Sequence, residues 1–429
     1  MNIKKQNYLN SSIVWLEEYW ACALILLTII GFVGKSYYNY PMGIMALIGL
    51  YKFMQHPRAV MDDSTLKSFS LAFLCLWIPL LISFPDAADY SHSAHTIFPY
   101  LRFYFAGIFI ICEISKDDKK FRLLIYSIFL IVSFWCIDAS IQYFLGHNLF
   151  GFPYDPFHGI TGMFYPKNKI AHICSILSIF CFIAVFIYGR KYKWQILLLA
   201  PLLFVVLISG RRAAWIMLVL SSIGFFIYLY ANSINKKQII KFTAIIVFII
   251  TIILSSTIIF NKTTNVRFKN TLGLFSTDFE TFDAATAGRL SLWKTGYTIF
   301  KSNPINGIGP RGYRHVFHNY ASEDNIWYTD SPQTHPHMLL LEILVETGAI
   351  GLIGYLLLIY LLIKDIYMRG KLKSELHFLL PVLVALFPLN AHMAFYGSIW
   401  SSMIWLLIAL YFARSKLNIH DIHENISPT

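Results

Sequence analysis

The sequence predicts an all-α polytopic membrane protein, and three features of the chain support that fold class. Hydrophobic residues make up 57% of its 429 residues and charged residues only 14%, well below the roughly 25% of an ordinary soluble domain. Apolar runs of about 17 to 25 residues recur along the whole length, and helices of that length cross a hydrocarbon core of about 30 Å. The runs show no strict alternation of apolar and polar residues, which favours helices over barrel strands.

In chain order, the apolar runs predict about 12 transmembrane helices. They cover residues 17–35, 37–55, 68–84, 97–115, 123–145, 169–188, 195–210, 212–231, 239–260, 337–363, 377–396 and 398–413. One large polar insertion separates helices 9 and 10. The predicted divisions are residues 1–260 with helices 1–9, residues 261–336 as an exported loop, residues 337–413 with helices 10–12, and residues 414–429 as a cytoplasmic tail. The insertion has no counterpart elsewhere in the chain, which argues against the paired halves of many transporters.

Lysine and arginine are distributed unevenly between the predicted spans. One set of connections carries most of them, and the opposite short loops hold only Lys35, Lys167, Lys169, Arg211 and Arg212. Loops rich in these residues stay in the cytoplasm, so both termini are predicted to be cytoplasmic and the insertion to face outward. Long translocated loops are exempt from that rule, so the cations of the insertion agree with this orientation. The net charge of +12 thus reflects topology and predicts no nucleic-acid partner.

The insertion is predicted to contain an amphipathic helix from Ala284 to Lys301, packed on the membrane domain or in the interface. The apolar residues that recur at helical spacing are Leu290, Trp293, Tyr297 and Phe300. Arg289 falls in the first turn, and Asn303-Pro304 ends the helix. Glycines follow at positions 307, 309 and 312. They predict turns, which also permit close approach of the backbone to a neighbouring segment or a ligand.

The motif His335-Pro336-His337 closes the insertion. Proline is favoured at the first position of a helix, so His337 is predicted in the first turn of helix 10. The helix dipole there disfavours imidazolium, which makes His337 a candidate general base. An interfacial histidine is the alternative. A metal site built from these histidines with His315 and His318 is not expected, because zinc sites usually show tighter spacings or a carboxylate or thiolate ligand.

Adjacent cations are the next candidates for ligand binding. Arg211 and Arg212 follow Ser209-Gly210 at the outward end of two spans, with no acidic residue near them in the sequence. Their planar donors predict a phosphate clamp, and lipid headgroup binding is the alternative. Arg102 is a further candidate, for which snorkelling to the interface is an equal explanation. Glu342 and Glu346 share one helix face and are predicted to hold helix 10 against cationic or amide partners.

The chain resembles the bacterial O-antigen ligase and polymerase superfamily in two stretches. One is the sequence THPHMLLLEILVETGAIG at residues 334–351, and the other is a pattern of residues between 288 and 309. The elements of that earlier pattern are Gly288-Arg289, Trp293, Asn303-Pro304, Gly307 and Gly309. In that family a long periplasmic loop ends in a His-rich motif that leads into a helix with Glu-x-Gly. The resemblance implies a GT-C type architecture in a Gram-negative inner membrane, with the active site facing the periplasm.

The same resemblance implies a glycosyltransferase that takes its glycan from undecaprenyl pyrophosphate, in contact with membrane lipids and without a cofactor. The family's histidine carries over to His337, its loop arginine to Arg289 and its helix-end arginine to Arg212, with Arg211 beside it. His337 would be the base and the arginines would stabilise the leaving pyrophosphate, giving metal-independent transfer with inversion. His335 is a further substrate-binding candidate, as Arg102 is.

The acceptor distinguishes the members of this superfamily: lipid A-core for a ligase, and another undecaprenyl-linked repeat for a polymerase. Polymerases of this class often carry Arg-x10-Gly patterns, and no arginine in this sequence has a glycine eleven positions on. We therefore expect an O-antigen ligase. Polymerase is the first alternative, followed by a protein O-oligosaccharyltransferase and a transporter.

Overall fold

The computed structural model describes residues 2–155, 159–189, 193–233, 276–323, 325–329, 333–391 and 393–417, with scattered residues between 235 and 273. These residues are mainly helical. They contain no strand, only isolated bridges that join His147 to Pro153 and Asp155 to Gly159. The all-α prediction is therefore confirmed for the described part of the chain.

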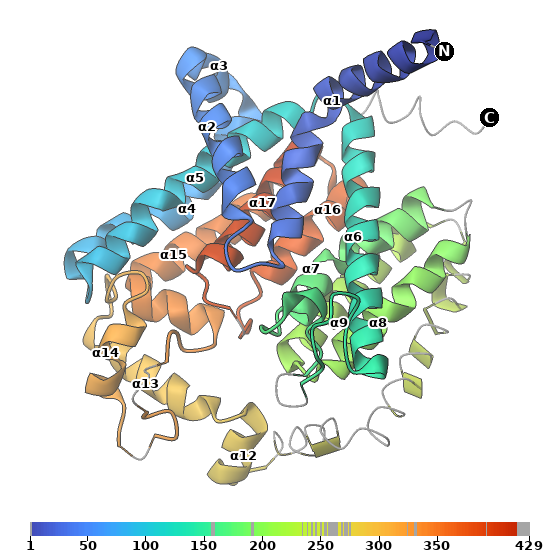
Figure 1. Cartoon of the computed structure of the whole chain (residues 1–429). Helices are drawn as coiled ribbons and strands as arrows, with labels where there is room; N and C mark the ends of the chain where they lie inside the picture. Colours follow the sequence, from blue (N-terminus) through green and yellow to red (C-terminus); the bar gives the residue numbers. More distant parts are fainter. Residues whose placement is uncertain are drawn as a thin grey trace.

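The helices fall into an N-terminal and a C-terminal group (Figure 1). The first group is α1 (Asn2–Gly31), α2 (Asn39–Gln55), α3 (Pro57–Asp62), α4 (Ser64–Ser83), α5 (Tyr90–Ile114), α6 (Asp118–Leu145), α7 (Ile170–Ile183), α8 (Leu199–Ile208) and α9 (Arg212–Asn232). The second is α12 (Phe279–Thr286), α13 (Arg289–Ser302), α14 (Tyr313–Tyr320), α15 (Leu339–Met368), α16 (Leu372–Ala385) and α17 (Ser398–Lys416).

Seven helical segments among the described residues are long and apolar enough to cross a membrane. They are Ser64–Asp86, Tyr90–Ile114, Asp118–Leu145, Ile170–Tyr188, Arg212–Asn232, Leu339–Met368 and Ser398–Lys416. A shorter apolar helix covers Trp194–Ile208. The predicted span 239–260 lies largely outside the described residues, so the count of twelve stays a prediction. The seven segments together make this a multi-pass membrane protein.

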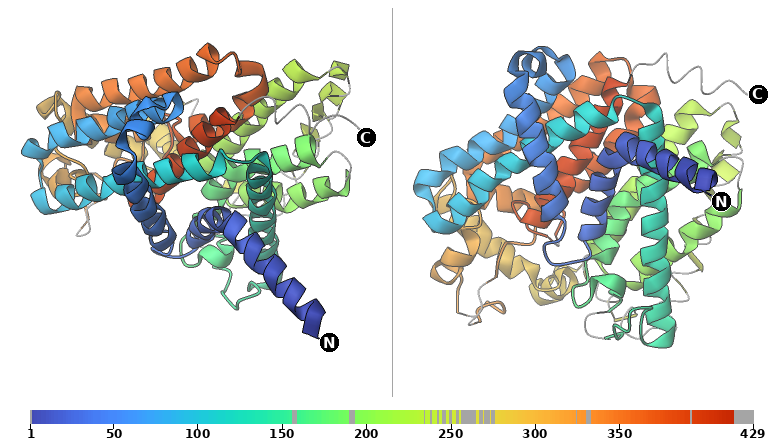
Figure 2. Two further views of the ribbon diagram at one scale, coloured as in Figure 1. Left: turned by 90° about the horizontal axis from the view of Figure 1, so that it is seen from above. Right: turned by 45° about the horizontal axis from the view of Figure 1, so that its top comes forward.

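Helix α17 lies at the centre of the bundle, where nearly all of its residues are buried. It packs on α5, α4 and α16, and α4 in turn packs on α15. Both views in Figure 2 show the blue α4 and the orange α15 side by side, so early and late parts of the chain share one core. The indole of Trp405 packs against Phe73 and donates a hydrogen bond to the hydroxyl of Tyr100 at 2.9 Å. Tight side-chain packing of this kind drives helix association within lipid.

Helices α12, α13 and α14 gather at the end of the molecule opposite the start of α1 (Figure 1). Helix α13 corresponds to the predicted amphipathic helix. It packs on α15, which agrees with the prediction that it packs on the membrane domain. The predicted apolar face is confirmed in part: Trp293 and Phe300 are half-buried against the apolar cluster that α13 forms with α15. The fully buried residues of the helix are Leu292, Thr295, Gly296 and Ile299. Tyr297, which the prediction placed on that face, is 53% exposed. The two helices approach closely at Gly296, where an added Cβ would lie 2.9 Å from Leu341.

The start of helix 10 also differs from the prediction. Helix α15 begins at Leu339, and His337 precedes it with a left-handed φ of 52°. The amide of Leu339 donates to the carbonyl of Asn390 at 2.9 Å, so another segment satisfies an N-terminal group of the helix. Pro336 therefore does not open the helix, and His337 does not lie in its first turn.

The segment between α13 and α14 packs its backbone directly on α15. Gly307 has a φ of 70°, and a Cβ there would lie 2.5 Å from the carbonyl carbon of Glu346. The next amide, Ile308 N, donates to the carbonyl of Val345 at 3.0 Å. The glycine turn thus serves approach to a neighbouring segment, and it fixes the backbone that leads to Arg311.

Candidate functional site

His337 is held by a single hydrogen bond next to α15. Its Nδ1 lies 3.0 Å from the carbonyl oxygen of Ala391. A carbonyl only accepts, so Nδ1 carries the proton and Nε2 is left as the basic atom. Burial, together with the charge of Arg289, lowers the pKa of His337 to about 4, although the hydrogen bond to Ala391 acts in the opposite direction. Burial and a nearby cation therefore keep the imidazole neutral near pH 7.

His335 lies against His337, with 4.1 Å between the two ring centroids. Its Nδ1 is 2.9 Å from the hydroxyl of Thr334, and the residue is buried. His335 also lines the larger cavity described below. The structure thus joins the base candidate to the cavity through this second ring.

Two helix N-termini supply a cluster of three arginines. Gly210, with a φ of 61°, makes the tight turn between α8 and α9, so that Arg211 is the N-cap and Arg212 the first residue of α9. Gly288, with a φ of 71°, precedes Arg289, the first residue of α13. Burial, together with the charges of Arg212 and Arg211, lowers the pKa of Arg289 to about 10. Cations and helix N-termini that gather in this way favour an anionic ligand.

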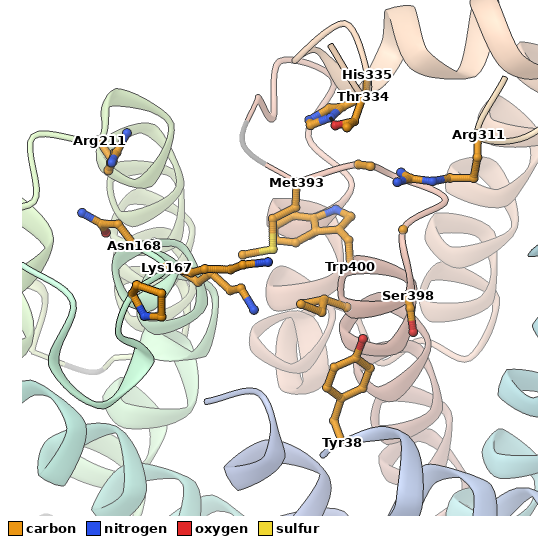
Figure 3. A pocket seen from close by; sticks show the side chains of 15 residues that line it. Tyr38, Lys167, Asn168, Arg211, Arg311, Thr334, His335, Met393, Ser398 and Trp400 are labelled. Atoms are coloured by element: carbon orange, nitrogen blue, oxygen red, sulfur yellow. Dashed lines mark hydrogen bonds between the residues drawn. The ribbon is translucent and has the colours of Figure 1, made fainter. Parts of the chain in front are cut away.

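A cavity of about 660 Å³ opens beside this cluster (Figure 3). Arg211 and Arg311 lie on opposite sides of it, with His335 and Thr334 on a third side. The remaining lining residues are Tyr38, Pro166, Lys167, Asn168, Lys169, Met393, Ala394, Gly397, Ser398, Ile399 and Trp400. Four cationic side chains on an otherwise mixed surface suit a large anionic ligand with an uncharged portion.

Arg102 occupies a different place from the other arginine candidates. Its Nη2 donates to the hydroxyl of Ser398 at 2.7 Å, and its guanidinium lies 4.7 Å from the Phe103 ring centroid. It lines a second cavity of about 340 Å³ with Arg311 and Arg314. The structure therefore groups Arg102 with two arginines of the segment 261–336, and not with Arg289.

The histidines considered as metal ligands are divided among several partners. His318 Nε2 lies 2.8 Å from the carbonyl oxygen of Thr329. His315 lies beside Asp89, with 3.7 Å between Nδ1 and Oδ2. Among the described residues, Asp89, His92 and His315 form the one group of metal-ligand type, with ligand atoms within 4.8 Å of one another. The four imidazoles of the sequence motifs do not converge on one centre.

Both glutamates of α15 are buried, and both accept backbone amides from other segments. Glu346 Oε2 accepts from the amide of Arg311 at 2.7 Å, and Glu342 Oε1 accepts from the amide of Tyr396 at 3.4 Å. Both carboxylates also attract the charge of Arg314. These contacts agree with the predicted structural role, in which helix 10 is held against amide and cationic partners.

Sequence reasoning did not select Lys167, Lys169 or Arg311 as site residues. A signal for the two lysines was available, because cations are scarce in the short loops on the outward side. The sequence signal for Arg311 was weaker, because it showed only that this arginine follows Gly309-Pro310 in a predicted turn. In the structure Arg311 has a left-handed φ of 65°. Its place between the two cavities depends on contacts with α15 and α17 that are remote in sequence.

Comparison with known proteins gives one family match. Residues 197–356 match the family described as O-antigen ligase. No curated protein matches the chain. The matched segment contains five candidate residues of the larger cavity and its surroundings: Arg211, Arg212, Arg289, His335 and His337.

Proposed function

Because residues 197–356 match the O-antigen ligase family, we propose that the protein is an O-antigen ligase. It transfers O-antigen polysaccharide from undecaprenyl pyrophosphate to lipid A-core on the periplasmic face of the inner membrane. The family match supports ligase-type or polymerase-type activity on polyprenyl-linked sugars. The observation that carries the proposal is the position of His337: its Nδ1 is fixed on the carbonyl of Ala391, and its ring lies beside His335, which lines the same cavity as Arg211.

In the proposed reaction, His337 Nε2 takes the proton of the acceptor hydroxyl as its oxygen attacks the anomeric carbon. The new glycosidic bond forms while the bond from that carbon to the pyrophosphate oxygen breaks. The bonding electrons leave with the pyrophosphate, and Arg211, Arg212 and Arg289 stabilise its charge. Attack from the face opposite the leaving group inverts the anomeric centre. The proton on His337 then passes to solvent, which restores the base.

Deletion of the gene tests this function at the level of the product. Lipopolysaccharide from the deletion strain is expected to lose its whole ladder on a gel, while lipid-linked polymer accumulates. Complementation with the wild-type chain should restore the ladder. A core that carries a single repeat would instead indicate the polymerase, and an unchanged profile would overturn both activities.

The pH dependence should reveal the state of His337. Its lowered pKa of about 4 leaves the free enzyme's base neutral at pH 6 to 8, so base activity is lost only as the pH falls toward about 4. Bound pyrophosphate favours imidazolium and should raise this pKa. The acid limb of kcat is therefore expected at a higher pH than the acid limb of kcat/KM for the donor. Initial rates at limiting and saturating donor would check this, and coincident limbs would contradict it.

Arginine stabilisation of the pyrophosphate predicts that transfer survives EDTA. It also predicts that Arg212→Lys lowers kcat/KM for the donor about tenfold or more, because an ammonium cannot reproduce the bidentate geometry of guanidinium. Both effects are measured with purified protein and a lipid-linked donor. Loss of activity on chelation, with recovery on addition of zinc or magnesium, would refute this arrangement.

A further inference from the structure

The smaller cavity, which the proposed mechanism leaves unused, adjoins the larger one. Its walls come from α5, the start of α14 and the first turns of α17. Arg311, Gly397 and Ser398 line both cavities. A ligand in the smaller cavity would therefore lie next to a ligand in the larger one, with Arg311 between them.

Three arginines in the smaller cavity have donors without partners. The Nε atoms of Arg102 and Arg314 and the Nη1 atom of Arg311 are buried and have no hydrogen-bond partner among the described residues. A buried donor left unsatisfied destabilises the folded state, and more so when it is charged. An anion among the three guanidiniums would offset the positive charge that they bring to this cavity.

The nearby carboxylates do not replace such an anion. Glu342 and Glu346 attract Arg314, yet burial and the charge of Arg311 still lower its pKa. The contacts of these two carboxylates are with the backbone amides of Tyr396 and Arg311, and neither glutamate lines the cavity. The guanidinium nitrogens thus keep donors for a ligand of opposite charge.

We propose that the smaller cavity binds a phosphate group carried by the acceptor lipid. This inference rests on the proposed function, because transfer between two lipid-linked substrates requires both to be held beside the same base. The larger cavity, with Arg211 and His335, takes the donor, and the smaller cavity takes the anionic part of the acceptor. Its volume of about 340 Å³ falls within the roughly 300–1,000 Å³ of small-ligand sites. A phospholipid headgroup offers the same chemistry, and the experiment separates the two sources.

Kinetics with the full chain in nanodiscs test the acceptor assignment. Arg314→Gln is expected to raise KM for a phosphorylated acceptor about tenfold, as loss of a charge-assisted contact of about 1.4 kcal/mol requires. KM for the donor, and KM for an acceptor whose phosphate has been removed enzymatically, should not change. Arg314→Lys should recover part of the loss. Arg58→Gln, a matched change at an exposed residue outside both cavities, should resemble wild type.

Other outcomes of this assay would overturn the proposal. These are an unchanged acceptor KM, a rise in donor KM instead, or an equal loss with the dephosphorylated acceptor. An effect of Arg314→Gln that follows the phosphatidylglycerol content of the nanodisc, and not the acceptor phosphate, would assign the cavity to a phospholipid. Arg102→Gln provides a second variant, with the same expected pattern, if Arg314→Gln fails to fold.

Direct binding separates this inference from the proposed function. Inorganic phosphate is titrated calorimetrically into the purified Arg289→Gln chain, in which the donor cluster is weakened. Adding Arg314→Gln to that chain is expected to weaken phosphate binding about tenfold, whereas adding Arg58→Gln should leave it unchanged. This result would support an anion site even if wild type transferred no glycan. Equal binding by both double variants would overturn the site even if wild type were an active transferase.

Discussion

Replacing His337 with alanine is expected to lower kcat for glycan transfer by about 10²- to 10⁴-fold, the contribution typical of a general base. Burial and the charge of Arg289 keep the imidazole of His337 neutral, and this ring lies beside His335, which lines the larger cavity. Radiolabelled or fluorescent transfer with purified protein measures the change. Activity near wild type would remove His337 from the mechanism and direct attention to His335.

A more stringent variant separates the base from the local backbone. His337 has a left-handed φ of 52°, which asparagine tolerates better than alanine does. The asparagine amide can also donate to the carbonyl of Ala391, but it cannot accept a proton as a base. His337→Asn should therefore keep the thermal stability of wild type and lose activity as His337→Ala does. Recovery of activity in His337→Asn would mean that the histidine only positions its segment.

The second large effect is expected at Arg289. Arg289→Gln should lower kcat by about 10²- to 10³-fold, the loss typical of removing one stabilising donor from a transition state. It should also raise the pKa of His337, because the charge of Arg289 helps to hold that pKa down. The pH profile of any remaining activity reports this shift.

Lys301 supplies a matched control on the same helix. It lies in the last turn of α13, where it is exposed and its Nζ is 4.8 Å from the Tyr297 ring centroid. Lys301→Gln removes the same unit of charge and is expected to leave kcat unchanged. Similar losses from the two substitutions would mean that the loop contributes diffuse positive charge, and the role of Arg289 would then be rejected.

The sequence predicted those parts of the fold that depend on local patterns. Apolar length predicted the membrane helices, and Gly210 with its adjacent arginines predicted a tight turn at the end of two spans. The end of α13 at Ser302 lies within one residue of the predicted Lys301, but the predicted start at Ala284 was wrong, because α13 begins at Arg289 after a break at Gly288. These features are set by helix periodicity and by turn residues, both of which are visible over short stretches.

Features that depend on distant segments could not be predicted from local patterns. Leu339 begins α15 because the carbonyl of Asn390 satisfies its amide, and no local signal in the sequence shows that contact. The close approach of Gly296 to Leu341 also depends on a distant segment, and it goes with a buried face of α13 that leaves Tyr297 exposed. Arg102 likewise was expected near the pyrophosphate, whereas its bond to Ser398 of α17 holds it in the second cavity.

The central claim is that one site moves a glycan from a lipid pyrophosphate to lipid A-core by means of His337 and the arginine cluster. The most direct measurement uses purified full-length protein, undecaprenyl pyrophosphate carrying a fluorescent O-antigen chain, lipid A-core and EDTA. The account predicts that label moves to lipid A-core with inverted anomeric configuration, and that one undecaprenyl pyrophosphate is released for each chain transferred. Label that stays on the lipid carrier, or that moves equally well with His337→Asn, would contradict it.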